Sequence, residues 1–152
     1  MQKLRVYSDT SVFGGCFDVE FQEASERFFQ LVREGRFVLI VSDLVNLELE
    51  RAPETVRGLL RSLPTEQIEM VETTSECTEL RKAYLDAGVL PPTSALDALH
   101  IAIATVNQAD MVVSWNFKHI VQFRRIAGFE GVNSLRGYRS PKIYSPKEVI
   151  EP

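Results

Sequence analysis

Four residues whose side-chain oxygens could bind a metal ion lie just after a predicted strand or near the start of a predicted helix. Asp9 comes directly after the first predicted strand and Asn116 after a later one, while Glu48 and Asp97 lie on predicted helices. Ligands of open α/β sheets bind at the carboxyl ends of the strands, so we expect these side chains to converge there. Three carboxylates and an amide suit a hard divalent cation, Mg²⁺ or Mn²⁺. A cation would also relieve the repulsion between the carboxylates.

Each of the four side chains also has a structural interpretation. Asp9 and Asn116 are of types that cap turns and helices. Asp97 follows Ser94 by three residues, which is the spacing of a capping box. Glu48 is of a type that usually faces solvent on a helix. Taken singly, the residues leave both interpretations open.

Short β-rich runs alternate with stretches of helical periodicity along the whole chain. The predicted strands are residues 4–8, 37–41, 68–71, 111–114 and 142–144. Strands that alternate with helices form parallel sheets covered on both faces. The sequence therefore predicts an α/β fold, a three-layer α/β/α sandwich with a mostly parallel central sheet. Its 152 residues, without a linker or repeat, predict a single domain over residues 1–152.

Capping signals mark the ends of several predicted helices. Gly35 and Gly88 follow helical stripes at the position where glycine commonly ends a helix. Ser42 is a predicted N-cap, and Ser145-Pro146-Lys147-Glu148 has the spacing of a capping box. The predicted helices cover residues 24–32, 44–48, 53–60, 80–87, 95–106, 117–127 and a last segment from 146.

Composition excludes several classes of protein. With 45% apolar and 25% charged residues, the chain is neither disordered nor fibrous. Its longest apolar run, residues 37–41, is far below the ~18 residues of a membrane helix, and no secretory signal is expected. Cys16 and Cys77 lack the spacing of a zinc site or a disulfide scaffold, so we expect a cytoplasmic protein.

The net charge of −4 is unevenly distributed. Residues 117–152 carry seven basic and three acidic side chains, and the rest of the chain carries ten basic and eighteen acidic ones. This asymmetry permits an anionic partner near the C-terminal third, although a solvated helix face gives the same pattern.

Taken together, the motifs resemble the PIN-domain family in order and spacing. The resemblance covers residues 4 to 123, and residues 142–149 resemble the family's closing strand. Its most specific part is Asp97-x-x-His100 on a helix, followed by Ser114-Trp115-Asn116. The other matching segments are Asp9-Thr10-Ser11 and Glu48-Leu49 after Ser42.

The resemblance implies a metal-dependent ribonuclease that hydrolyses RNA phosphodiester bonds with Mg²⁺ or Mn²⁺. Small members of the family, the VapC-like group, are toxins of type II toxin–antitoxin pairs, so an antitoxin partner and a homodimer are implied. Asp9 and Asp97 match the family's metal-binding aspartates, and Glu48 matches its glutamate. Asn116 matches a catalytic position more often held by a fourth acid, which puts a second metal ion in doubt.

Neighbouring residues have predicted supporting roles. Thr10 and Ser11 are expected to hydrogen-bond the carboxylates and hold them in place. Lys118 and Arg124 are candidates for phosphate contacts, with Trp115 stacking on bases. A basic surface helix with a buried Trp115 is the equally supported alternative.

Two rival functions are compatible with parts of the pattern. A phosphatase with an aspartate nucleophile usually has a second aspartate two residues on, where this chain has Ser11. A PIN fold that has lost catalysis and binds RNA or protein is favoured by Asn116. The three remaining acids, Asp9, Glu48 and Asp97, favour the nuclease.

Overall fold

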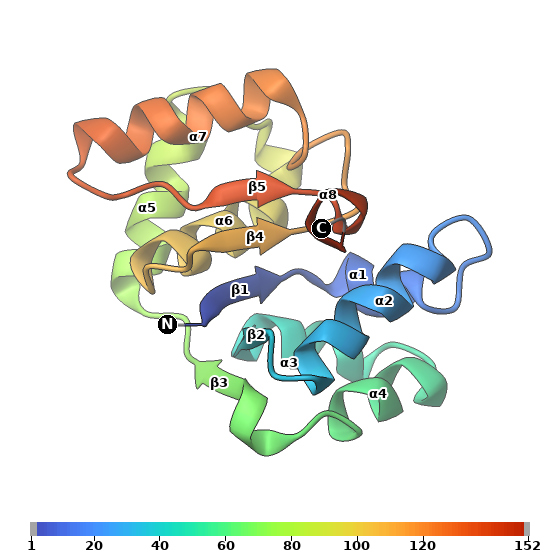
Figure 1. Cartoon of the computed structure of the whole chain (residues 1–152). Coiled ribbons are helices and arrows are strands. Elements are labelled where there is room, and N and C mark those ends of the chain that lie inside the picture. Colours follow the sequence, from blue (N-terminus) through green and yellow to red (C-terminus); the bar gives the residue numbers. More distant parts are fainter. Residues whose placement is uncertain (1–2, 151–152) are drawn as a thin grey trace.

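The computed structural model describes residues 3–150, and its helices and strands alternate along the chain (Figure 1). In chain order the elements are β1 (Leu4–Ser8), α1 (Thr10–Gly15), α2 (Gln22–Arg33), β2 (Phe37–Ser42), α3 (Asp43–Glu50), α4 (Glu54–Arg61), η1 (Thr65–Gln67), β3 (Ile68–Val71), α5 (Ser75–Asp86), η2 (Pro92–Ser94), α6 (Ala95–Val106), β4 (Met111–Val113), α7 (Phe123–Leu135), β5 (Lys142–Tyr144) and α8 (Pro146–Ile150). Within this range no helix is long and apolar enough to cross a membrane.

The five strands form one parallel sheet in the order β3-β2-β1-β4-β5. From β1 the chain adds β2 and β3 on one side and then returns to place β4 and β5 on the other. The carboxyl ends of β1 and β4 therefore meet where the direction of winding changes, which is the place where open α/β sheets bind ligands. The predicted parallel α/β fold is confirmed.

Helices cover both faces of the sheet and make the outer layers of the predicted sandwich. One layer holds α6 with α5 packed on it and α7 on α5, and the other holds α2 with α8 and α1 (Figure 1). The residues of α6 from Ala98 to Thr105 are all buried, because this helix lies between the sheet and α5.

The predicted capping signals mark the ends of α2 and α5 and the starts of α3 and α8. Gly35 and Gly88 end α2 and α5 with positive φ angles, 79° and 74°, a conformation that glycine adopts without steric cost. The Ser42 hydroxyl accepts from the Val45 N–H and caps α3. At α8, one half of the predicted capping box forms, with the Ser145 N–H donating to the Glu148 carboxylate at 2.9 Å.

The helix predicted for residues 117–127 is wrong. Residues 117–122 make turns, and α7 begins only at Phe123 and extends to Leu135. Gln122 has an extended backbone and its side chain accepts from the Arg125 N–H, so it starts a new helix where the pattern suggested a continuous one. Phe123 is 85% exposed and does not belong to an apolar stripe.

The sequence did not predict α1, which is six residues long and contains two adjacent glycines. Gly15 is required there for close packing. A Cβ atom at this position would lie 2.4 Å from the Ser25 Oγ and 2.7 Å from the Trp115 Nε1. Its absence lets the Trp115 indole N–H donate to Ser25 at 2.7 Å, which joins α1, α2 and the segment after β4.

Candidate active site

Asp9 lies at the carboxyl end of β1 and is 5% exposed. Its two carboxylate oxygens accept hydrogen bonds from two serines, Ser11 at 2.6 Å and Ser114 at 2.8 Å. Although Asp9 is the N-cap residue of α1, its side chain makes no capping hydrogen bond. The structure therefore commits its carboxylate to the hydroxyls of the β1–β4 edge and not to a helix cap.

The pKa of Asp9 is raised above its ordinary value because burial disfavours the charged form. Electrostatic attraction to His100 and the two serine hydrogen bonds oppose this effect, while the negative charge of Asp97 adds to it. Asp97 is thus near enough to Asp9 for the two carboxylates to repel each other.

Glu48 is held on α3 by two donors to the same oxygen. Its Oε1 accepts from the Thr10 hydroxyl at 2.5 Å and contacts the His100 Nε2 at 2.8 Å. Burial raises the pKa of Glu48, but the hydrogen bonds from His100 and Thr10 and the charge of His100 outweigh it and lower the pKa. Glu48 is therefore an ionised acceptor at the same edge. It is not a freely solvated surface residue.

A buried chain of polar groups fixes the orientation of His100. Its Nδ1 lies 2.6 Å from the Tyr7 hydroxyl, which in turn lies 2.8 Å from the Ser42 hydroxyl. Burial keeps the pKa of Tyr7 well above its ordinary value, so the phenol stays protonated. The Nε2–H of His100 donates to the Glu48 carboxylate, and the Tyr7 hydroxyl holds the other ring nitrogen. The buried core therefore orients the Glu48 carboxylate through His100.

Asp97 projects from the first turn of α6, and its Oδ2 lies 3.1 Å from the His119 Nδ1. The capping box suggested by its spacing from Ser94 is not formed, because the Ser94 hydroxyl turns to the His119 ring and makes no cap. Asp97 and His100 are three residues apart on α6 and share one face of it.

Asn116 acts as a cap. Its amide oxygen accepts from the His119 N–H at 2.9 Å, and its own N–H donates to Ser114 at 2.9 Å. The capping alternative is thus what the structure shows for this side chain. Asn116 still stands close to the acids, because Ser114 donates to Asp9.

Three residues at this edge were not predicted as site residues. Ser114 binds Asp9, His100 binds Glu48 and His119 binds Asp97. The motif Asp97-x-x-His100 carried a usable signal, because residues three apart on a helix face the same way. The partners of Ser114 and His119 come from other elements and leave no local signal.

No family model matches the chain, and no curated protein matches its sequence. Two solved structures match most of it. A chain of VapBC2 from Rickettsia felis, solved bound to a DNA fragment from the promoter, has a TM-score of 0.61 and 15% identity, covering 93% of this chain and 98% of that one. A chain of DNA-bound VapBC from Salmonella typhimurium has a TM-score of 0.59 and 18% identity, covering 94% and 98%. The chain has a PIN-like fold.

The acidic edge of this PIN-like fold does not form a closed metal cage. Among residues 3–150, no three His, Cys, Asp or Glu side chains are gathered so that they alone would hold a metal ion. Glu48 contacts His100 and Asp97 contacts His119, while Asp9 is bound by serine hydroxyls, so none of the three acids has a lysine or arginine partner among residues 3–150. Mg²⁺ usually keeps several waters and takes one or two carboxylates together with substrate phosphates. The donor set fits that mode of binding.

The basic residues of the C-terminal third do not form one track in the PIN-like fold. Lys118 is exposed in the turns after Asn116, and Arg124 is exposed on the first turn of α7. The Arg125 guanidinium donates to the Val89 carbonyl at 2.7 Å. Arg139 donates to the Gln108 carbonyl at 3.0 Å, at the opposite edge of the sheet. Lys118 and Arg124 therefore remain candidates for phosphate contacts, while Arg125 and Arg139 are engaged elsewhere.

Trp115 does not present a free face for stacking. It is 9% exposed, its indole N–H donates to Ser25, and its ring stacks on Phe21 with centroids 4.3 Å apart. The alternative of a buried Trp115 is the one that the structure shows. Thr10 and Ser11, by contrast, make the carboxylate hydrogen bonds expected of them.

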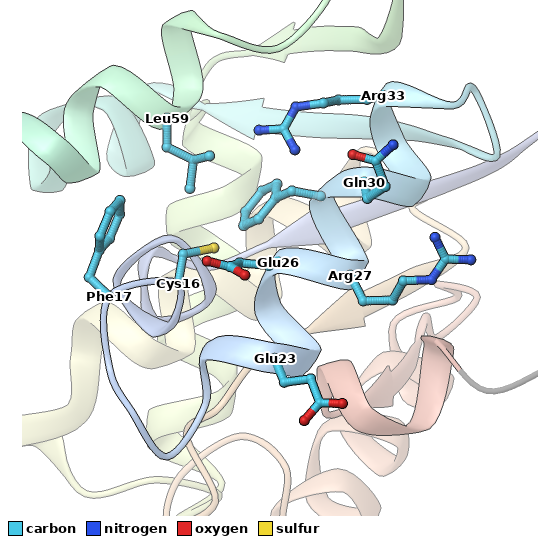
Figure 2. A pocket seen from close by; sticks show the side chains of 9 residues that line it. Cys16, Phe17, Glu23, Glu26, Arg27, Gln30, Arg33 and Leu59 are labelled. Carbon is cyan, nitrogen blue, oxygen red and sulfur yellow. The ribbon is translucent and has the colours of Figure 1, made fainter.

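A separate cavity of about 510 Å³ lies between α1, α2 and α4 of the PIN-like fold. Figure 2 shows Cys16 and Phe17 on one side, Leu59 on another, and the charged side chains of α2, among them Glu26 and Arg33, along it. Burial raises the pKa of the Cys16 thiol to about 12, so this cysteine is not a nucleophile.

Proposed function

We propose that this chain is a metal-dependent endoribonuclease that hydrolyses RNA phosphodiester bonds and serves as the toxin of a type II toxin–antitoxin pair. One observation carries the proposal. A buried aspartate, Asp9, stands at the switch point of a PIN-like fold beside a second carboxylate, Asp97, and its hydrogen-bond partners are neutral hydroxyls. Among the described residues neither Asp9 nor Asp97 has a lysine or arginine partner, and a divalent cation would supply the balancing charge.

In this proposal Asp9 and Asp97 hold one Mg²⁺ or Mn²⁺, and Glu48 contacts its water shell. When bound, the ion lowers the pKa of a coordinated water and neutralises charge on the phosphate. Ser11 and Ser114 fix the Asp9 carboxylate from two sides, so both its oxygens keep their directions during the reaction. His119, in the turns that follow β4, fixes Asp97 in the same way through its ring nitrogen.

Glu48 has the task of orienting the attacking water. Its Oε1 is occupied by Thr10 and His100, and its carboxylate stays ionised, so the second oxygen is the acceptor left for a water proton. Lys118 and Arg124 then attract the RNA backbone toward the acidic edge.

Cleavage of labelled RNA by the purified chain tests the proposal directly. We expect cleavage with Mg²⁺ or Mn²⁺, none with EDTA, and none by the Asp97→Asn variant with either ion. An absence of cleavage with both ions and several RNAs would contradict the nuclease and favour the second candidate below.

The second candidate is a PIN-fold module that binds RNA or protein with weakened catalysis. Asn116 favours it, because its amide oxygen is used in a cap and supplies no charge to the site. RNA binding without cleavage by the wild-type chain in Mn²⁺ would identify this function.

An antitoxin partner and a homodimer belong to the same proposal. Support for the partner comes from the two similar structures, which are of VapBC complexes bound to DNA. Co-expression with the product of an adjacent small open reading frame should give a stable complex with no ribonuclease activity. Sedimentation of the isolated chain tests the dimer. The free, buried cysteines Cys16 and Cys77 are compatible with the reducing cytoplasm that we propose as its compartment.

A further inference from the structure

Next to the acidic edge lies a second cavity, of about 440 Å³, with aromatic walls. Phe21, Trp115 and Phe117 line it, together with Glu20, Glu23 and Lys147. These residues come from the start of α2, the segment after β4 and the start of α8. Its volume is that of a small-molecule site, not of a groove for a helix.

The three aromatic rings differ in how tightly their neighbours hold them. Phe21 and Trp115 stack at 4.3 Å with an interplanar angle of 27°, and the bond from Trp115 to Ser25 fixes this pair. Phe117 meets Trp115 edge-on at 6.0 Å and 64°, and it is 49% exposed. The fixed pair of Phe21 and Trp115 therefore stands beside a half-exposed ring, Phe117, which lines the cavity and can stack on a planar ligand.

This cavity is joined to the proposed catalytic acids by a short hydrogen-bonded path. The backbone N–H of Trp115 donates to the Ser11 Oγ at 2.9 Å, and the Ser11 hydroxyl donates to Asp9 at 2.6 Å. A ligand in the aromatic cavity would thus lie directly alongside the edge that carries Asp9. Because Phe117 directly precedes Lys118, a predicted phosphate contact also adjoins it.

We infer that the aromatic cavity binds one unpaired nucleobase of the RNA, at a nucleotide that flanks the cleaved phosphodiester. Phe117 provides the stacking surface, and Lys147 attracts the adjoining phosphate. Glu20 and Glu23 disfavour a second phosphate but accept hydrogen bonds from the exocyclic amino groups of adenine, cytosine and guanine. The inference rests on the proposed function, since the RNA is the substrate of the same edge.

The single tryptophan of the chain, Trp115, gives a direct readout that needs no catalysis. We would titrate the protein in EDTA with short single-stranded oligoribonucleotides and, separately, with each nucleoside monophosphate, and follow Trp115 fluorescence. The oligoribonucleotides should quench it saturably, and amino-bearing bases should bind more tightly than uracil. Quenching by monophosphates with equal affinity would mean a site for free nucleotides and would overturn the assignment to RNA.

Phe117→Ala should raise the Kd of the oligoribonucleotide by about 5- to 100-fold, the effect of losing one base–aromatic stack. Phe17→Ala is the matched control, because Phe17 is 53% exposed and lines the separate cavity of Figure 2. It should leave the Kd unchanged. Lys147→Ala should weaken the oligoribonucleotide through its phosphate.

The outcomes separate the two proposals. Cleavage of RNA with a Kd and a cut site unchanged by Phe117→Ala would overturn the base site and leave the nuclease standing. Saturable quenching that Phe117→Ala weakens, without any cleavage by wild type, would support the base site and contradict the nuclease. Absence of quenching by every oligoribonucleotide, or quenching only by a protein partner, would overturn the base site.

Discussion

The two edges of the parallel sheet treat their acidic residues in opposite ways. At the amino edge, Glu69 receives two hydrogen bonds from the Arg5 guanidinium, at 2.9 and 2.7 Å, and Asp110 lies 3.5 Å from Arg139. At the carboxyl edge, Asp9 is bound by serines and Asp97 by His119. In the part of the chain that the structure describes, neither Asp9, Glu48 nor Asp97 has a lysine or arginine partner.

This difference separates structural acids from acids that are available for function. A carboxylate paired with an arginine has its charge balanced and stabilises the fold where it stands. Carboxylates without a lysine or arginine partner repel one another when both are ionised, and a bound cation removes that repulsion. The contrast is sharper than anything that residue type or spacing indicates, because both edges carry Asp and Glu.

The largest expected effect comes from Asp97→Asn at the carboxyl edge. Loss of a partner behind a metal ligand usually costs about 10- to 100-fold in activity, so loss of a direct ligand should lower RNA cleavage by more than that. Stability should change by less than about 1 kcal/mol, because Asp97 pairs only with a partly exposed histidine. Asp110→Asn at the amino edge is the matched control and should cleave at the wild-type rate. Equal cleavage rates for Asp97→Asn and wild type would remove Asp97 from the site.

The pH dependence of stability should differ in sign between two acids of the same edge. The pKa of Asp9 is raised in the folded state, so its contribution favours folding at low pH and is lost as pH rises from about its ordinary value of 3.8 through the raised pKa. The pKa of Glu48 is lowered, so its contribution is present above its ordinary value of 4.5 and is lost as pH falls through the folded pKa.

Urea unfolding as a function of pH measures both slopes. Asp9→Asn should be more stable than wild type near neutral pH, whereas Glu48→Gln should be less stable there. Cleavage by wild type should increase as pH rises through the raised pKa of Asp9, because the ionised carboxylate is required. If Asp9→Asn were less stable than wild type at neutral pH, the charge of Asp9 would be compensated in the fold. The two edges of the sheet would then not differ in the way described above.

Substitution of the basic residues Lys118 and Arg124 should have an effect of intermediate size, on RNA binding. Changing Lys118 and Arg124 together to alanine should weaken RNA binding and reduce the salt slope by about 1.4, because each neutralised phosphate of a single strand contributes about 0.7. Arg139→Ala, at the amino edge, should leave the slope unchanged. Filter binding at several salt concentrations measures it, and an unchanged slope in the double variant would place the RNA elsewhere.

The smallest effect is expected for Asn116→Asp. If Asn116 lay among metal ligands, the new carboxylate would bind Mn²⁺ more tightly and allow a second ion. Its amide oxygen instead caps the turn at His119, and aspartate caps about as well as asparagine. Calorimetric titration with Mn²⁺ should therefore give nearly the same affinity and stoichiometry as wild type. Tighter binding, or a second ion, would return this position to the site.

Features that depend on near neighbours in the chain were predictable from the sequence. Ser42, Gly35, Gly88 and the Ser145–Glu148 box each place a cap within a few residues of the group that it satisfies. The five strands are short β-rich runs, and their alternation with helices indicated the parallel sheet. The same local reading was wrong at residues 117–127, where the caps Asn116 and Gln122 divide the segment.

The tertiary structure alone decided which partner each acid has. Ser114 reaches Asp9 across 105 residues of sequence, and His100 reaches Glu48 across 52. Arg5 likewise meets Glu69 across 64 residues at the other edge. These pairs depend on strand order and register, which bring distant segments within hydrogen-bond distance. Patterns in the local sequence do not predict them. The sequence by itself determined the types of ligand and the elements that carry them, while the folded sheet determined which carboxylates pair with arginine and which do not.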